Sequence, residues 1–410
     1  MGKRPLVIGI VGLVLLLIGL PGLIALLTHG HLYVGYGTPI PWAMWVVLYV
    51  YFIGLSAGAF LISSLVYAFG MKQFERIGPL ALFTALVCLL TALLFIWFDL
   101  GHMERFFFVF TRPNFTSPLT WIVWLYTIYF FLLLAEMWLV MRPSFVRGGE
   151  GKGFKAGLYR FLALGVRDLS PRALERDRKI LRILGTIGVP LAIAFHGSVG
   201  TVFAVTVARD YWHTGLLPIM VLVSALASGG ALLAAIVTFV VPRGLIERRE
   251  EILGLGRLLL LLLFAYFLME ISEILVSLYG AAPSHAIPIR EQLFGSNWWI
   301  FWILGMGMAL VGPMLILTFP GRRSALWTGI AGLLAAIGFV GIRWNIVLPG
   351  FAVEELPGIS QSFFEPHWTY GPYIPSAMEW EVTLFIVGVG VLILALGFWF
   401  LPLRAEEAPA

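Results

Sequence analysis

Ten long apolar runs constrain the fold of this chain more than any other feature. A helix that crosses a bilayer needs about 20 mainly apolar residues. Runs of this kind lie at roughly 6–28, 42–69, 78–98, 119–141, 183–208, 215–241, 257–279, 298–319, 324–348 and 380–402. Strands of a membrane barrel alternate apolar and polar residues over about ten positions, whereas these runs are continuously apolar. The sequence therefore predicts an all-α, polytopic membrane protein, with ten transmembrane helices in a single membrane domain over 1–410.

The composition also indicates that lipid is the main solvent of this chain. Apolar residues make up 60% of the chain and charged residues 12%, whereas soluble domains carry about 25% charged residues. That is too little charge to cover a water-facing surface. The single cysteine, Cys88, excludes an intramolecular disulfide, a cysteine-rich zinc site and a cysteine-ligated iron–sulfur cluster. We therefore expect this chain to bind no metal.

Basic residues are distributed unevenly between the segments that connect the runs. If the N-terminus is cytoplasmic, all but five of the 27 lysines and arginines fall in cytoplasmic segments, as the positive-inside rule requires. The five exceptions are Arg105, Arg112, Arg209, Arg290 and Arg343. The sequence thus predicts that both termini are cytoplasmic. The first run is longer than a usual signal-peptide core and no small-x-small cleavage site follows it, so we expect a retained helix.

The segment 142–182 is a long basic loop on the predicted cytoplasmic side. Its apolar residues recur at helical spacing with basic residues between them, as shown by Phe154, Leu158, Phe161 and Leu162 beside Lys155, Arg160 and Arg167. This pattern predicts a short amphipathic helix on the anionic inner leaflet. Ser170-Pro171 is typical of an N-cap and first helical residue, which would open the lead into the fifth helix.

Two short segments resemble each other and indicate a possible internal repeat. Ser56-Ala57-Gly58-Ala59-Phe60-Leu61 in the second run is similar to Ser228-Gly229-Gly230-Ala231-Leu232-Leu233 in the sixth. Residues 42–208 and 215–348 would then form two four-helix bundles, flanked by the first and last helices. The alternative is that small residues recur wherever membrane helices pack closely.

Ionisable residues are costly inside a membrane, so their positions are informative. Most lie near the outer ends of the predicted helices, namely Asp99, His102, Glu104, Arg105, Arg209, Asp210, His213, Glu270, Glu273, Arg343, Glu379 and Glu381. Only Glu136 lies toward the inner side, and His196 stands near the middle of the fifth helix. The longer outer loops, 99–118, 280–297 and 349–379, are our candidates for partner docking.

The histidines argue against a haem. A membrane b-type haem needs two imidazoles on facing helices at similar depth, and only His196 lies well inside a run. The other six, His29, His31, His102, His213, His285 and His367, lie at or beyond the outer boundary. Cys-x-x-Cys-His does not occur either. We expect no haem, so electrons cannot cross the bilayer through this chain alone.

Each candidate site residue has a structural alternative. His196 is either a ligand-binding group or an interhelical hydrogen-bond partner. Glu270 and Glu273 are three residues apart and face nearly the same side of their helix. They are either proton acceptors or partners of an arginine such as Arg343. Asp99, His102 and Arg105 share one helical face if the third helix continues past Asp99; if it ends there, they are solvated loop residues.

Several motifs resemble the NrfD/PsrC family of respiratory membrane subunits. The second-helix signature of the family is similar to Pro41-Trp42-Ala43-Met44 with Gly54-Leu55-Ser56-Ala57-Gly58-Ala59-Phe60. The next loop of the family is similar to Asp99-Leu100-Gly101, Arg105-Phe106 and Arg112-Pro113-Asn114-Phe115-Thr116-Ser117-Pro118. The ten-helix branch of the family is similar at His196, Trp212-His213-Thr214-Gly215, Ser228-Gly229, Arg343-Trp344-Asn345 and Tyr373-x-Pro375-Ser376-x-x-Glu379. That branch includes membrane subunits of periplasmic hydrogenases, of the sulfite-reductase-linked transmembrane complex and of alternative complex III.

The resemblance implies a haem-free subunit in a prokaryotic cytoplasmic membrane, which binds menaquinone or ubiquinone near the outer face. A periplasmic ferredoxin-like iron–sulfur subunit would dock there, with further catalytic or cytochrome subunits. By position, His196, Asp99 and Glu273 look like the protonatable groups beside the quinone, with Arg343 as a neighbour. We add His102, Arg105, Glu270 and Tyr373 to the predicted quinone-binding residues.

The predicted quinone slot lies near the outer ends of helices three, five, seven and nine. His196 would bond one quinone carbonyl while Glu273 and Asp99 relay protons. Two other classes fit part of the pattern. Buried carboxylates and repeated bundles also suit a proton-coupled transporter, and the polar outer residues would also suit a membrane anchor without its own quinone site.

Overall fold

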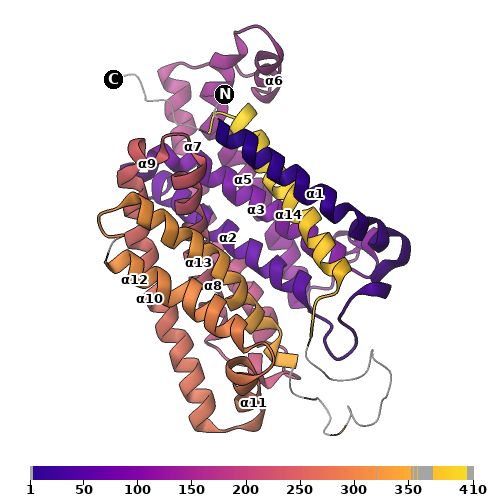
Figure 1. Ribbon diagram of the computed structural model, residues 1–410. Helices are drawn as coiled ribbons and strands as arrows, with labels where there is room; N and C mark the ends of the chain where they lie inside the picture. Colours follow the sequence, from indigo (N-terminus) through magenta and orange to yellow (C-terminus); the bar gives the residue numbers. More distant parts are fainter. Residues whose placement is uncertain (1–2, 320, 352–353, 355–357, 359–372, 404–410) are drawn as a thin grey trace.

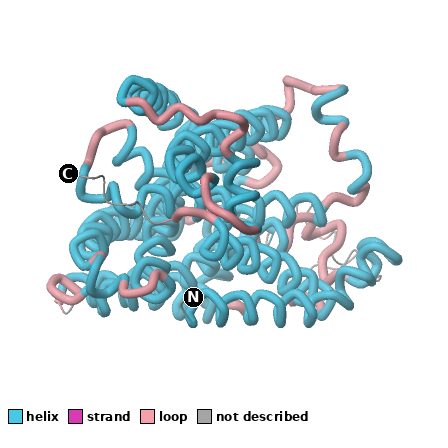
Figure 2. Tube along the Cα trace, turned by 90° about the horizontal axis from the view of Figure 1, so that it is seen from above, coloured by secondary structure: helices cyan, strands magenta, loops and turns pink. Residues whose placement is uncertain are grey.

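The computed structural model describes residues 3–319, 321–351, 354, 358 and 373–403 (Figure 1). Within them, ten helices are long and apolar enough to cross a membrane, which confirms the predicted all-α, ten-helix fold. The described residues contain no strand, and Figure 2 shows them as helix and loop alone. His367, Arg404 and most of the loop 349–379 lie outside the described residues, so the predictions about them are not addressed by the structure.

The spanning helices follow the predicted order, and short helices connect them. The spans are α1 (Lys3–His29), α2 (Met44–Tyr67), α3 (Gly78–Asp99), α5 (Pro118–Gly149), α7 (Pro171–Ala204), α8 (Leu217–Ala235) continued by the π-helix η5 (Ile236–Val240), α10 (Arg249–Gly280), the π-helix η6 (Ile300–Val311) continued by α12 (Gly312–Thr318), α13 (Ala325–Val347) and α14 (Ala377–Phe400). The short α-helices are α4 (Phe108–Thr111), α6 (Phe154–Leu162), α9 (Gly244–Glu247) and α11 (Pro283–Phe294).

Three spans extend clearly beyond their apolar runs. α5 continues to Gly149, α7 starts at Pro171 and α10 starts at Arg249, whereas the runs were 119–141, 183–208 and 257–279. The start of α7 follows the predicted signal, because the Ser170 hydroxyl accepts a hydrogen bond from the Ala173 amide (3.3 Å). The predicted outer loop 280–297 is wrong in part, since it contains the helix α11.

The molecule has two opposite faces, one at each end of the long helices. We call the face with the start of α1, the helix α6 and the end of α14 the basic side (Figure 1). The opposite face carries α11 and is called the pocket side. The assignment of the basic side to the cytoplasm stays a prediction.

The helix α6 confirms the short helix predicted in the basic loop. It is held on the end of α5, where Trp138 Nε1 donates to the Leu162 carbonyl oxygen (2.9 Å) and the Tyr159 ring contacts Phe145. Phe154 and Phe161 remain exposed. Their placement on the inner leaflet stays a prediction.

The helices α2 and α8 pack against each other in the middle of the molecule. α2 also contacts α3 and α7, and α8 also contacts α7, α10 and α13. The two backbones approach closely at Gly58 and Gly229, where a Cβ atom on either residue would lie 2.6 Å from the Cα of the other. This is the small-residue packing that membrane helices use in place of a hydrophobic driving force. The division into two four-helix bundles stays a prediction.

Candidate functional site

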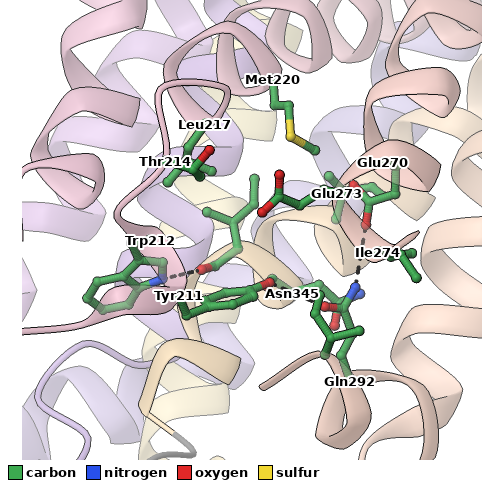
Figure 3. A pocket seen from close by; sticks show the side chains of 13 residues that line it. Tyr211, Trp212, Thr214, Leu217, Met220, Glu270, Glu273, Ile274, Gln292 and Asn345 are labelled. Atoms are coloured by element: carbon green, nitrogen blue, oxygen red, sulfur yellow. Dashed lines mark hydrogen bonds between the residues drawn. The ribbon is translucent and has the colours of Figure 1, made fainter. Parts of the chain in front are cut away.

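A pocket of about 450 Å³, counted with the space at its open mouth, lies on the pocket side (Figure 3). It is formed by α8, α10, α11, α13 and the turn that leads into α8, which contains the short helix η4 (Asp210–Trp212). Its lining residues are Tyr211, Trp212, Thr214, Leu217, Met220, Glu270, Glu273, Ile274, Ile289, Gln292, Ile342, Asn345 and Ile346.

The two carboxylates predicted as a pair both line this pocket. Glu270 is buried and accepts hydrogen bonds from the Tyr266 hydroxyl (2.8 Å) and from Gln292 Nε2 (3.4 Å). Glu273 is half-buried and makes no hydrogen bond within the part of the chain that the structure describes. The pocket therefore holds one carboxylate fixed by neighbours and one available to a ligand.

The opposite wall comes from the turn before α8. The Tyr211 hydroxyl lies 2.9 Å from the Asn345 carbonyl oxygen and 3.2 Å from Gln292 Oε1, so it can donate to either. Trp212 Nε1 donates to the Ile346 carbonyl oxygen (2.7 Å), which fixes the turn on α13. Burial, reinforced by Glu270 and Glu273, raises the pKa of Tyr211 well above its ordinary value. Its hydroxyl therefore stays protonated and able to donate.

The pocket combines apolar walls with a few converging polar groups. Met220, Ile274, Ile289 and Ile342 supply apolar surface. The polar groups provide hydrogen-bond donors at Tyr211 and Gln292 and proton-accepting groups at the two carboxylates. This arrangement suits a planar, mainly apolar molecule that carries polar oxygens and exchanges protons.

Arg343 lies on α13 but does not line the pocket. Its side chain is fully buried, and Nη1 donates to the Ser224 hydroxyl of α8 (2.8 Å). Nε and Nη2 have no hydrogen-bond partner among the described residues. The ion pair with Glu270 or Glu273 that we kept as an alternative does not occur in this part of the chain.

His196 is also buried away from the pocket. Its Nε2 lies 3.1 Å from the Ile53 carbonyl oxygen of α2, and its Nδ1 lies 2.7 Å from the Ala192 carbonyl oxygen of its own helix. Both ring nitrogens therefore face backbone acceptors, which matches the alternative of an interhelical hydrogen-bond partner. A direct role at the quinone stays a prediction for this residue.

Asp99 and Tyr373 belong to a second polar cluster on the pocket side. The Tyr36 hydroxyl donates to Asp99 Oδ1 (3.2 Å), and the Tyr373 hydroxyl donates to Glu379. Glu379 also accepts from the Gly35 amide (2.7 Å) and completes a capping box with Ser376 at the start of α14. These contacts connect the chain before α2 to α3 and α14, and none of these residues lines the pocket.

His102 and Arg105 are surface residues. α3 ends at Asp99, so the shared helical face with His102 and Arg105 does not form. The solvated alternative holds for His102 and Arg105, whereas Asp99 accepts a hydrogen bond from Tyr36. Their side chains are 65% and 57% exposed and both contact Glu104. They do not meet the pocket.

Four polar lining residues were not among the predicted site residues: Tyr211, Thr214, Gln292 and Asn345. Tyr211 and Gln292 lie between the apolar runs, where a polar residue needs no special explanation. Asn345 was noted only as part of a family motif. The one available signal was the polar turn from Arg209 to His213, since it follows a spanning helix directly.

Comparison with known proteins places the chain in a family. Residues 34–354 match the family described as polysulphide reductase, NrfD. The chain is 39% identical over 376 residues to a selenate reductase subunit of Mesobacillus selenatarsenatis, covering 89% of this chain and 87% of the relative. It is 30% identical over 411 residues to a putative dimethyl sulfoxide reductase membrane subunit of Halobacterium salinarum, covering 97% and 91%.

A more distant relative has a name that mentions a quinone. The chain is 26% identical over 385 residues to the Hdr-like menaquinol oxidoreductase integral membrane subunit of Archaeoglobus fulgidus, covering 91% of this chain and 88% of that one. Fold and comparisons together define a multi-pass membrane subunit of an oxidoreductase complex. The chain belongs to the NrfD family, as its motifs indicated.

Proposed function

We propose that this chain is the haem-free, quinone-binding subunit of its complex, and that the quinone ring occupies the pocket between α8, α10, α11 and α13. The observation that carries the proposal is the placement of Glu270 and Glu273 beside Tyr211 and Gln292 in an apolar pocket. Menaquinone is the favoured quinone, because a relative is named as a menaquinol oxidoreductase subunit.

Each group around the pocket has a separate task. A bound quinone supplies two-electron, two-proton redox chemistry at its two oxygens. The Tyr211 hydroxyl donates to Gln292 or to the Asn345 carbonyl oxygen, and it would turn this proton to a quinone oxygen when the ring is bound. Gln292 holds both Tyr211 and Glu270 in place. Glu273 takes up or releases the proton, because it faces the pocket without a hydrogen-bond partner in the described residues. The isoleucines and Met220 exclude water from the ring.

The electrons must reach the quinone from a partner. In our proposal a periplasmic ferredoxin-like iron–sulfur subunit docks on the pocket side, which is then the outer face of a prokaryotic cytoplasmic membrane. The exposed segment from Gly101 to Phe115, with His102 and Arg105, lies on this side and offers an accessible docking surface. Further catalytic or cytochrome subunits complete the complex.

Removing both pocket carboxylates tests the quinone site. The double variant Glu270→Gln, Glu273→Gln in the assembled complex is expected to lower quinone-linked turnover by about 100-fold, because proton exchange at a positioned acid or base is worth about 10²–10⁴-fold. Retained quinone is measured in lipid extracts of the same preparations. The control is Glu381→Gln, a glutamate of α14 at the pocket side that does not line the pocket. Unchanged turnover and quinone content in the double variant would refute the site.

Gln292 is a positioning residue with a distinct signature. Gln292→Leu leaves Glu270 and Tyr211 without this partner, and an unsatisfied buried polar group costs about 1–3 kcal/mol. We expect KM for quinone to rise about tenfold with a smaller change in kcat. Tyr211→Phe removes the hydroxyl that Gln292 holds and keeps the contact between Gln292 and Glu270, so it isolates the Tyr211 hydrogen bond. An unchanged KM in Gln292→Leu would show that Gln292 does not organise the two walls.

A further inference from the structure

Four exposed arginines lie close together at the basic side. Two belong to the start of α10 and two to the loop between α12 and α13, and we call them the arginine cluster: Arg249, Arg257, Arg322 and Arg323. None of them forms an ion pair in the part of the chain that the structure describes, whereas the preceding arginine, Arg248, lies 4.0 Å from Glu251. Glu250 is the only acidic residue next to a member of the cluster in the sequence, so the net charge stays positive.

Contacts between the two segments bring the halves of the cluster together. Arg249 Nη2 donates to the Arg323 carbonyl oxygen (2.9 Å). The Thr328 hydroxyl of α13 donates to the Gly321 carbonyl oxygen of the same loop (2.9 Å). Thr328 also packs on α10, since a Cβ on Gly256 would lie 2.6 Å from its methyl group. The loop is therefore held against the first turns of α10.

An exposed apolar surface continues from the cluster along the spanning helices. Leu261, Phe264 and Leu268 follow Arg257 at helical spacing on α10 and are 66%, 53% and 50% exposed. Phe319, at the end of α12, is 72% exposed. Exposed apolar side chains on a spanning helix face lipid, and arginines near the helix end reach toward the headgroups. Arg257 therefore stands at the boundary between hydrocarbon and phosphate groups.

The chemistry of the cluster suits phosphate. A guanidinium group binds a phosphate through two parallel N–H···O hydrogen bonds, and basic sites at the ends of spanning helices are typical of anionic headgroups. Arg249 and Arg257 are eight residues apart, which places their Cα atoms about 12 Å apart along the axis of α10. One phosphate group is too small to bridge this span, whereas a headgroup with two phosphates reaches both ends.

We propose that the arginine cluster binds the headgroup of an anionic phospholipid with two phosphates, of the diphosphatidylglycerol class. Its acyl chains lie along the exposed apolar surface of α10 and against Phe319. This surface complements acyl chains, and it has no counterpart in a free phosphate ion or an acidic protein segment. The site lies on the face opposite the pocket and does not depend on the proposed quinone chemistry.

The first test measures lipid binding to the purified complex. Diphosphatidylglycerol is titrated into delipidated complex in detergent, and bound lipid is counted by native mass spectrometry. The variant Arg257→Gln, Arg322→Gln, Arg323→Gln should bind it about 100-fold more weakly, because each arginine at an anionic lipid surface contributes roughly fivefold. Arg249 is kept, since its hydrogen bond to the backbone at Arg323 holds the loop in place.

A matched control removes three charges elsewhere on the basic side. Arg172→Gln, Arg178→Gln, Lys179→Gln changes exposed residues of α7 and should keep the parent affinity. Phosphatidylglycerol, which has one phosphate, should bind the parent more weakly, and inorganic phosphate should not compete. The proposal is overturned by equal binding in parent and cluster variant, by an equal loss in the control, by equal affinity for phosphatidylglycerol, or by competition from inorganic phosphate.

A second measurement needs no substitution. Diphosphatidylglycerol with a photoreactive group in its headgroup is activated in the parent complex, and the labelled residues are located by peptide mass spectrometry. Labels within 249–257 and 321–327 support the site. Labels confined to other segments overturn it. If the cluster variant loses a protein subunit and keeps its lipid, the arginines form a protein interface and the lipid site is wrong.

Discussion

Replacing Asp177 with alanine should lower the free energy of unfolding by about 3–5 kcal/mol, because it leaves a buried guanidinium unpaired. Arg142 on α5 is only 1% exposed, and its Nε donates to Asp177 Oδ2 of α7 over 2.6 Å. Its Nη1 also donates to the Asp168 carbonyl oxygen (2.9 Å). This ion pair connects the basic-side ends of α5 and α7, so the variant should also increase the mobility of the segment between these helices.

Arg176 offers a matched control on the same helix. Its side chain is 67% exposed, and its Nε lies 4.0 Å from Asp177 Oδ1. Exposed ion pairs contribute about 0–1 kcal/mol, so Arg176→Ala should change stability very little. Thermal unfolding of the purified complex in one detergent compares both variants with the parent. Equal losses for Asp177→Ala and Arg176→Ala would contradict a special role of the buried pair.

Gly229→Ala is expected to destabilise the protein by about 1–3 kcal/mol, the usual cost of extra atoms in a packed interior. A Cβ at this position would lie 2.4 Å from the Leu55 carbonyl oxygen and 2.6 Å from the Ala59 amide nitrogen. Both are backbone atoms of α2, so no side chain can move aside and the helices must separate. The loss is measured as a lower midpoint of thermal unfolding.

The neighbouring glycine gives the control for this prediction. A Cβ on Gly230 would have no atom within 4 Å, and alanine is a better helix former than glycine by about 1 kcal/mol. Gly230→Ala should therefore leave the midpoint unchanged or raise it. If the two variants lost stability equally, the crossing of α2 and α8 would not depend on the close approach at Gly229.

The fold was predictable wherever contact with lipid requires apolar residues in the sequence. Each run of about 20 apolar residues became a span, since a backbone in lipid must satisfy its own hydrogen bonds. The helix ends were less predictable, because α5 continues to Gly149 and α7 starts at Pro171, beyond the apolar runs that predicted them. At the start of α7 the N-cap Ser170 and the first helical residue Pro171 determine the boundary, and hydropathy does not. α11 was missed because its sequence, with prolines and charged residues, resembles a loop.

The site was predictable only where a polar residue interrupts an apolar run. Glu270 and Glu273 met this condition, and their three-residue spacing placed both in one pocket. His196 met it as well, yet its ring nitrogens face backbone carbonyl oxygens. Gln292 and Tyr211 reach the pocket through the packing of α11 and the turn before α8. Such contacts between segments far apart in sequence leave no local pattern.

The pairing of α1 with α14 has a consequence for biogenesis. Gly19 of α1 fits against the backbone of Glu381 and Phe385 in α14, whereas only 22% of the spanning part of α1 is buried. The ribosome produces α1 before its main partner α14, roughly 20–70 s earlier at about 5–20 residues per second. During this interval α1 must persist as a lone helix in lipid, which its continuous apolar surface permits. Insertion of α14 then pairs these two helices, which lie far apart in the sequence.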